Sequence, residues 1–150
     1  MFSFDFSMNI PMNIDKLFDV LTNFTLLKEL LPDQVQECKI IQQNEKETIT
    51  EELLKFNTYF GNQILHQKTT HKIFHPHTIV NQTIDGPFKD SVLTIVLEDN
   101  NDSTKVNLNG KCKIPLKYSL LSPVIKKKYK NFCISMLYKI NNTYNIKIND

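Results

Sequence analysis

Hydrophobic and polar residues alternate along the first ten positions, MFSFDFSMNI. Phe2, Phe4, Phe6, Met8 and Ile10 take one side, and polar or acidic residues take the other. A period of two is the pattern of a half-buried β-strand, and the proline that follows ends it. We therefore predict that the first element is a strand.

The pattern changes to a helical period directly afterwards. Ile14, Leu17, Phe18 and Leu21 follow the spacing i, i+3, i+4, i+7, and Asn13 stands where a helix N-cap is expected. The next segment, TLLKELLPD, is typical of a second short helix, which its proline ends. Two short helices are thus predicted after the first strand.

Six more strands are predicted in the middle of the chain. The turn-forming clusters NEK, FGN, HPH, DGP and DNNDS separate runs rich in β-branched and aromatic residues. Sequential strands with such short joints pair as an antiparallel meander, which makes one strongly bent sheet. The predicted strands span residues 35–43, 47–59, 63–74, 78–85, 89–98 and 104–114.

The C-terminal part returns to a helical pattern. Ser122 is the expected N-cap, Pro123 takes the first helical position, and Asn141-Asn142 ends the helix. At 100° per residue its apolar side chains fall on an arc of roughly 140°, which is wide enough to face a core. The members of this arc are Ile125, Tyr129, Phe132, Cys133, Met136, Leu137 and Ile140.

This order of elements predicts an α+β helix-grip fold. A single bent sheet needs a cover for its apolar concave face, and the long helix is the element large enough to provide it. We expect a curved seven-stranded antiparallel sheet wrapped around the C-terminal helix, with two short helices after the first strand. A chain of 150 residues fits one domain, which we place at residues 1–142, followed by a tail at 143–150.

The amino-acid composition says little about the fold, but it excludes some classes of binding partner. The net charge of +2 is too small to indicate nucleic-acid binding, and all 18 basic residues are lysine, without the arginine fork that reads guanine. Three widely spaced cysteines are typical of reduced thiols. The N-terminus lacks a basic signal region, and no apolar run approaches the ~20 residues that span a bilayer. We expect a soluble, cytoplasmic protein with no nucleic-acid partner; the oligomeric state stays open.

Three segments carry a resemblance to a known family. In this order, IDGPFKDSVLTIVLED, STKVNLNGKCKIP and LLSPVIKKKYKNF resemble the START-like helix-grip superfamily (SRPBCC), and most closely its polyketide cyclase/lipid-transport and coenzyme Q-binding branch. That branch carries a Gly-Pro-Phe-Lys turn, here residues 86–89, ahead of a central strand. The aromatic residue usual in this strand is replaced by Ile95 and Leu97. The resemblance covers residues 1–142 and implies a cavity between sheet and helix, but no catalytic residue.

Alternation along each predicted strand indicates which side chains face that cavity. It places Gln67, Thr69, His71 and Gln82 among apolar residues, with His71 opposite Gln82 if Ile73 pairs with Val80. A few polar groups in an apolar concavity are typical of a small-molecule site, although such groups also bond one another or a buried water. The residues predicted to contact a ligand are Phe4, Phe6, Leu54, Phe56, Gln67, His71, Gln82, Leu93, Ile95, Leu108, Ile125, Tyr129, Phe132 and Met136.

The favoured function is non-catalytic binding or transport of a small hydrophobic ligand such as a lipid, an isoprenoid or a quinone-like molecule. No cofactor is predicted. One alternative is an enzyme of the polyketide cyclase/aromatase kind, in which His71 would be the acid or base. Another is a protein-interaction module whose cavity is filled by its own phenylalanine side chains, of which the chain has ten.

Two further clusters contain residue types that could serve other chemistry. His71, His75 and His77 lie near one another in sequence, but Pro76 interrupts them at a turn and no carboxylate or thiol has a suitable spacing, so no metal site is predicted. A lysine-rich edge gives a weak contact with an anionic membrane surface as an additional hypothesis. Its members are Lys126, Lys127 and Lys130, with Lys111, Lys113 and Lys117.

Overall fold

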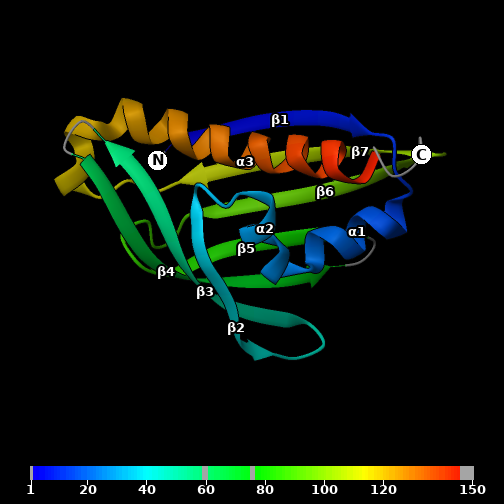
Figure 1. Ribbon diagram of the computed structural model, residues 1–150, viewed down its shortest axis with the longest axis horizontal. Coiled ribbons are helices and arrows are strands. Elements are labelled where there is room, and N and C mark those ends of the chain that lie inside the picture. Colours follow the sequence, from blue (N-terminus) through cyan, green and yellow to red (C-terminus); the bar gives the residue numbers. More distant parts are fainter. Residues whose placement is uncertain (1, 59–60, 75–76, 146–150) are drawn as a thin grey trace.

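A curved antiparallel sheet wraps around one long helix (Figure 1). The structure is a computed structural model that describes residues 2–58, 61–74 and 77–145. The described elements are β1 (Phe2–Ile10), α1 (Ile14–Thr22), η1 (Phe24–Leu26), α2 (Leu27–Leu30), β2 (Val35–Gln43), β3 (Glu47–Thr58), β4 (Gly61–Phe74), β5 (Thr78–Asp85), β6 (Val92–Asn100), β7 (Ser103–Cys112), η2 (Leu116–Leu121) and α3 (Ser122–Asn145).

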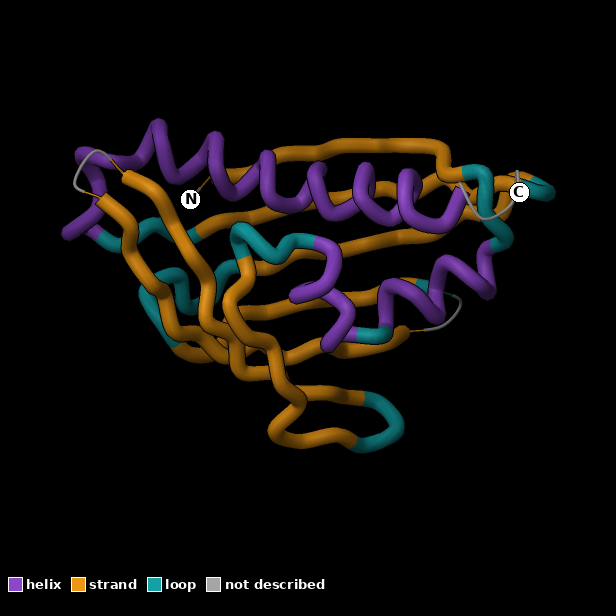
Figure 2. The backbone as a smooth tube through the Cα atoms, viewed as in Figure 1, coloured by secondary structure: helices purple, strands orange, loops and turns teal. Residues whose placement is uncertain are grey.

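The described strands form one seven-stranded sheet in the order β1-β7-β6-β5-β4-β3-β2, with every neighbouring pair antiparallel. The meander therefore runs from β2 to β7, and β1 joins its far edge. The sheet curves so that α3 lies along its concave side, while α1 and α2 cover the lower part of the same side (Figure 2). The predicted helix-grip architecture, including the two short helices after the first strand, is confirmed.

Local sequence signals explain most of the element boundaries. The Asn13 side chain caps α1, because its Oδ1 accepts a hydrogen bond of 2.8 Å from the backbone N–H of Asp15. β6 begins at Val92 instead of residue 89, because the preceding residues form a tight turn in which the Ser91 N–H bonds the Phe88 carbonyl over 3.1 Å. In this turn Asp90 has a positive φ of 75°, which interrupts an extended strand.

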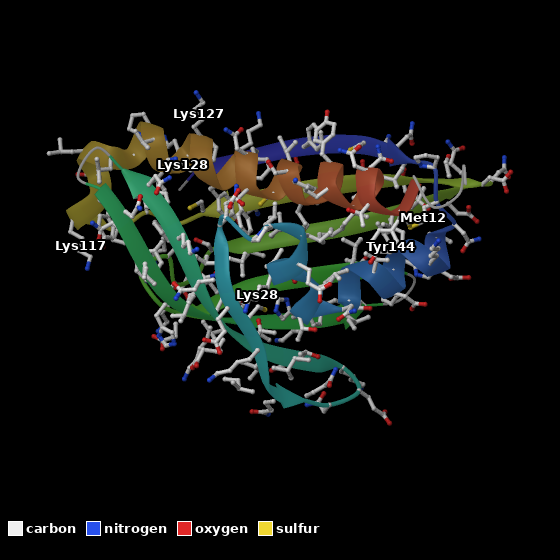
Figure 3. The ribbon with its side chains drawn as sticks, in the orientation of Figure 1. Met12, Lys28, Lys117, Lys127, Lys128 and Tyr144 are labelled. Carbon is white, nitrogen blue, oxygen red and sulfur yellow. The ribbon has the colours of Figure 1, made fainter. Side chains whose placement is uncertain are left out.

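Both predicted ends of the C-terminal helix differ from the observed ones. Ser122 is not an N-cap: its backbone is already helical (φ −50°, ψ −47°), because η2 runs directly into α3. The helix also continues past Asn142 to Asn145. Tyr144 packs against the hydrophobic core there, and Figure 3 shows it close to Met12. This contact extends the helix beyond the Asn-Asn pair that was expected to end it. The domain boundary at residue 142 stays a prediction.

One part of the hydrophobic core lies between α3 and the strands at the β1 edge of the sheet. Strands β1, β6 and β7 face α3 across fully buried side chains that include Ile10, Val106, Leu137 and Ile140. At Gly110 a Cβ atom would overlap the Phe4 ring, so the missing side chain lets this ring lie flat on β7. Among the described helices, none combines the length and hydrophobicity that a membrane span requires.

Candidate functional site

The described residues leave two neighbouring chambers between the concave sheet face and the helices. The first chamber has a volume of about 150 Å³ and the second about 400 Å³. We call the two together the cavity, because they share six lining residues. These are Leu54, Gln67, Thr83, Ser91, Tyr129 and Phe132.

One wall of the first chamber is apolar and comes from helices. The amphipathic pattern of α1 turns Val20 and Leu21 inward, and the short helices that follow add further aliphatic and aromatic side chains. α3 supplies the rest of this wall. The helical residues are Val20, Leu21, Phe24, Leu27, Leu30, Tyr129, Phe132, Cys133, Met136 and Ile140. An apolar ligand would meet a continuous hydrophobic surface here.

The opposite wall is polar and comes from strands β3, β4 and β5. Strand register brings its side chains together: Glu52 pairs with Gln67, and His71 pairs with Asn81. Thr69 lies between the two pairs on the same face of β4. All five residues line the first chamber. We call them, with Thr50, the polar wall.

The carboxyl group of Glu52 is the centre of the polar wall. The residue is 4% exposed, and Thr69 Oγ1 donates a hydrogen bond of 3.0 Å to its Oε2. Gln67 Nε2 donates in turn to Thr69 Oγ1 over 3.5 Å. The other carboxyl oxygen, Oε1, lies 2.7 Å from Thr50 Oγ1. Two threonines and a glutamine thus surround the carboxyl where a lysine or arginine would be the usual partner of a buried acid.

The imidazole of His71 extends this chain of hydrogen bonds from Thr50. Its Nε2 lies 2.7 Å from Thr50 Oγ1, and its Nδ1 lies 2.6 Å from Asn81 Oδ1. Asn81 Nδ2 donates to the Leu93 carbonyl over 3.2 Å. The ring also stacks on Phe24, with centroids 3.9 Å apart. Both ring nitrogens and one ring face are therefore occupied by the protein itself.

The hydrogen bonds link the protonation states of Glu52 and His71 through the single hydroxyl hydrogen of Thr50. Since Asn81 uses its Nδ2 donor on the Leu93 carbonyl, its Oδ1 faces His71, and the imidazole proton sits on Nδ1. Thr50 Oγ1 donates its single hydroxyl hydrogen to Glu52 Oε1 over 2.7 Å when the carboxyl is ionised. A neutral His71 presents a bare Nε2 to the same hydroxyl, and it receives that hydrogen when Glu52 Oε1 carries a proton of its own. A neutral imidazole and a protonated carboxylic acid satisfy every group in the chain.

The pKa values of both groups shift toward their uncharged forms. Desolvation raises the pKa of Glu52 from 4.5 to about 7, although hydrogen bonds from the two threonines and Gln67 oppose the rise. Desolvation lowers the pKa of His71 from 6.5 to about 4, against the hydrogen bond with Asn81. At neutral pH the imidazole is uncharged and the carboxyl is near its midpoint. A carboxyl in this state can donate a hydrogen bond to a ligand or exchange a proton with it.

The second chamber is the exposed end of the cavity. The side chains of Lys55, Asn57 and Asn131 line it and are exposed, so this chamber meets solvent. Lys128 lies over the Phe56 ring at 5.9 Å from its centroid. Charged groups are thus placed at the rim, and apolar groups lie deeper inside.

The Gly-Pro-Phe-Lys turn forms part of this rim. Gly86 has φ +117°, and a Cβ atom there would lie 2.8 Å from the His66 carbonyl oxygen, so the turn requires glycine and presses against β4. Phe88 lines the second chamber, and its ring centroid lies 6.2 Å from that of Tyr118. The turn therefore places an aromatic side chain at the cavity.

Most of the residues predicted to contact a ligand do line the cavity. They are Leu54, Phe56, Gln67, His71, Leu93, Ile95, Ile125, Tyr129, Phe132 and Met136. Phe4, Phe6 and Leu108 do not, because β1 and β7 pack directly against α3 and these side chains belong to the core instead. The Phe4 ring meets the Tyr129 ring edge-on at 5.7 Å.

The predicted facing of β5 is wrong by one residue. Ile73 pairs with Ile79 and not with Val80, so Asn81 stands opposite His71 and Gln82 lies on the other face of the sheet. The hairpin is tighter than expected: Phe74 pairs with Thr78. Both faces of this strand alternate apolar and polar residues, so the pattern itself does not distinguish them. On β3, in contrast, Leu54 faces the cavity as predicted. Because side chains two residues apart share a face of a strand, Glu52 faces the cavity as well, although the sequence prediction did not include it.

The other groups considered for chemistry lie apart from one another. His77 stacks edge-on against Phe18 at 5.1 Å and lies 3.7 Å from Asp15, away from the polar wall; His75 falls outside the described residues. Within the described ranges, no three His, Cys, Asp or Glu side chains gather as a metal site. Burial raises the pKa of Cys38 and of Cys133 to about 12, which disfavours a reactive thiolate at either position.

Comparison with known proteins identifies the fold but no close relative. No protein-family model matches the chain, and no curated protein matches it. Solved structures match over nearly the full length. TTHA0849 from Thermus thermophilus is 15% identical, covers 93% of this chain and 94% of its own, and superposes with a TM-score of 0.79. The ZhuI aromatase/cyclase from Streptomyces sp. R1128 is 6% identical, with coverages of 98% and 95% and a TM-score of 0.79.

A third match carries the superfamily name. A START superfamily protein from Mycobacterium smegmatis is 12% identical, with coverages of 95% and 97% and a TM-score of 0.65. At these identities the likeness concerns the fold, and it agrees with the order of elements, the sheet and the long helix described above. The chain therefore has the helix-grip fold of the START-like superfamily, as its sequence resemblance implied.

Proposed function

We propose that the protein binds a small hydrophobic ligand with one polar head group and carries it in the cavity. The observation behind this proposal is the contrast between the two walls of the first chamber. Helical side chains form an apolar surface, and Glu52, Gln67 and Asn81 face it from the sheet. Such a site holds the body of a ligand by apolar contact and orients its head by hydrogen bonds. A lipid, an isoprenoid or a quinone-like molecule has this shape.

The size of the cavity supports a ligand of this class. The second chamber alone, at about 400 Å³, lies within the range of known small-molecule sites. A ligand that buries about 300 Å² of apolar surface would gain roughly 7 kcal/mol before the costs of association, at about 25 cal/mol per Å². This space remains although Phe24, Phe56, Phe88 and Phe132 all line the cavity. A filled cavity that serves a protein partner is therefore disfavoured.

An enzyme is the second candidate, and one observation favours it. Glu52 has a pKa of about 7, which suits a general acid–base near neutral pH. The fold is also that of the ZhuI aromatase/cyclase. His71 is the weaker candidate for this role, because Thr50 and Asn81 already bond both ring nitrogens. If the protein is an enzyme, the group that meets the substrate is Glu52.

The proposed location is the cytoplasm. Cys38, Cys112 and Cys133, all in the described part of the chain, are free thiols, which fits a reducing compartment.

Native mass spectrometry of the purified protein, followed by organic extraction, tests the binding proposal. We expect a one-to-one complex with a hydrophobic molecule, or one-to-one binding of an added apolar fluorophore such as N-phenyl-1-naphthylamine. Leu65→Trp, which fills part of the second chamber, is expected to weaken binding at least tenfold. Its neighbour Ile64 is 60% exposed, so Ile64→Trp is the matched control. An empty protein that binds no apolar probe would remove the proposal, and equal loss in both variants would place binding outside the cavity.

A further inference from the structure

The segment between β7 and α3 exposes two leucines almost completely. Leu116 is 92% exposed and Leu120 is 95% exposed, more than any other large hydrophobic side chain in the described part of the chain. Both belong to the short helix η2, whose remaining apolar residues, Tyr118 and Leu121, are half-buried or partly exposed. Isolated exposed apolar residues are common, whereas two almost fully exposed leucines on one short segment form a local apolar feature that calls for an explanation.

Tyr118 holds this segment so that the leucines point outward. Its backbone N–H bonds the Pro115 carbonyl over 3.0 Å, and its ring lies beside Phe88. Lys117 Nζ lies 5.1 Å from the centre of the same ring. The anchor of η2 is thus one aromatic residue, and neither leucine contributes to the buried core.

Four exposed lysines lie on η2 and on the first turns of α3, close in sequence to the two leucines. Figure 3 shows Lys117 and Lys127 on opposite sides of the end of the molecule where α3 begins, with Lys117 below the helix and Lys127 above it. Lys126 and Lys130 are exposed on the first turns of the same helix. In the described residues none of these four lysines forms an ion pair with a carboxylate; the nearby Asp90 is already paired with Lys113 at 3.5 Å. We call the set of Leu116, Lys117, Leu120, Lys126, Lys127 and Lys130 the basic tip.

We propose that the basic tip docks on the surface of an anionic lipid bilayer, with Leu116 and Leu120 inserted among the lipid head groups. Proteins that bind at a membrane surface combine a small inserted apolar group with exposed cations. The free energy of apolar insertion and the attraction of the cations to anionic lipids then add together. The lysine-rich edge was a hypothesis from sequence; the exposed leucines give it an insertion element.

Other occupants fit the basic tip less well. A second copy of this chain would bring the same lysines, and like charges would face each other. A stable protein partner needs about 800 Å² on each side, far more than two leucine side chains on a short helix offer. A bilayer needs no complementary shape, and its anionic head groups match the lysines.

The position of the basic tip also relates it to the cavity. Ile125 and Lys128, which line the second chamber, belong to the same turns of α3, and Phe88 links that chamber to Tyr118. Docking would therefore bring the exposed end of the cavity to the membrane. This last point rests on the proposed function, whereas the docking itself does not.

Co-sedimentation of the full chain with lipid vesicles tests the proposal without any cavity ligand. We expect binding to vesicles of phosphatidylcholine with about 30% phosphatidylserine, weak binding to phosphatidylcholine alone, and weaker binding as salt rises. Leu116→Ser and Leu120→Ser together should lower the partition coefficient about a hundredfold, since full burial of one leucine is worth about tenfold or more. Lys117→Gln with Lys127→Gln should weaken binding to the anionic vesicles.

A matched control separates insertion from general surface hydrophobicity. Ile40 and Ile41 are partly exposed on β2, at a distance from η2 (Figure 1), and their double change to serine should leave vesicle binding unchanged. Thermal unfolding of each variant checks that it is folded. Equal vesicle binding by the leucine variant, absence of binding at low salt, or a leucine-dependent dimer in sedimentation equilibrium would each overturn the proposal. Because ligand binding is measured separately, failure here leaves the proposed function standing.

Discussion

Replacement of Glu52 by glutamine tests the proton count in the polar wall. The amide has the shape of the carboxylic acid. Its Nε2 can donate to Thr50 Oγ1, which lies 2.7 Å from Glu52 Oε1, and the Thr50 hydroxyl hydrogen is then free to point to His71 Nε2. Its oxygen can still accept from Thr69. Glu52→Gln therefore keeps the chain of hydrogen bonds and removes the ability to ionise.

The expected effect follows from the pKa of Glu52. Folding raises this pKa from 4.5 to about 7, so the folded protein holds the carboxyl proton more tightly than the unfolded chain does. The wild type consequently loses stability, relative to the variant, as pH rises from about 4.5 through 7. The interval corresponds to about 3 kcal/mol in the free energy of unfolding, an order-of-magnitude figure. The two proteins should be equally stable near pH 4 and differ by about 3 kcal/mol at pH 8, with Glu52→Gln the more stable.

Urea unfolding at pH 4 and at pH 8, followed by circular dichroism, measures this difference. Glu51→Gln is the matched control, because Glu51 lies on the outward face, 3.4 Å from Lys39, and loses only a partly exposed ion pair. It should not gain stability at pH 8. A Glu52→Gln variant that is less stable than the wild type at pH 8 would refute the reasoning, since the carboxyl would then be a stabilised anion.

Three further predictions concern the turn, the imidazole and a buried thiol. Gly86→Ala should lower the free energy of unfolding by about 1–3 kcal/mol, because φ is +117° and the new Cβ would meet the His66 carbonyl oxygen. Gly61→Ala is the control: φ is also positive (+98°), but the new Cβ would meet no atom within 4 Å, so the loss of stability should be smaller. Chemical denaturation of both variants measures the difference. His71 should stay neutral down to about pH 4 with its proton on Nδ1, and ¹⁵N chemical shifts of the ring should show a single bare Nε2 at pH 7. Cys133, with a pKa of about 12, should react with iodoacetamide at pH 8 far more slowly in the folded protein than in urea; equal rates would contradict its burial.

The fold was predictable because the signals that begin and end its elements are local in sequence. The first strand alternates without exception, and polar turn clusters separate the later strands, so the ranges predicted for β1, β2 and β5 match the observed ones. The inward arc of α3 was also correct, since a long amphipathic helix has one apolar side. Solved structures of the START-like helix-grip fold confirm the overall prediction.

The site was less predictable because its polar residues depend on register. A shift of one residue in the β4–β5 pairing exchanged Gln82 for Asn81, and no hydrophobic contrast on β5 could reveal it. Glu52 followed from the alternation that was correctly assigned to Leu54, but a buried acid without a cation runs against the usual preference for exposed carboxylates. The contribution of Phe24 arises from a three-residue helix, which is too short for periodicity to be recognised.

Because side chains fill the concave face of the sheet unevenly, positions along the chain differ in how well they tolerate a change of side-chain volume. Side chains of β1 and β7 meet α3 directly, so a change of volume at Leu108 or Val106 opens a void or forces strain. Residues such as Leu93, Leu65 and Met136 border empty space, and substitutions there can be absorbed by the cavity. The architecture of this chain therefore depends on side-chain volume along β1 and β7, whereas the shape of the cavity can change along its lining without loss of the fold.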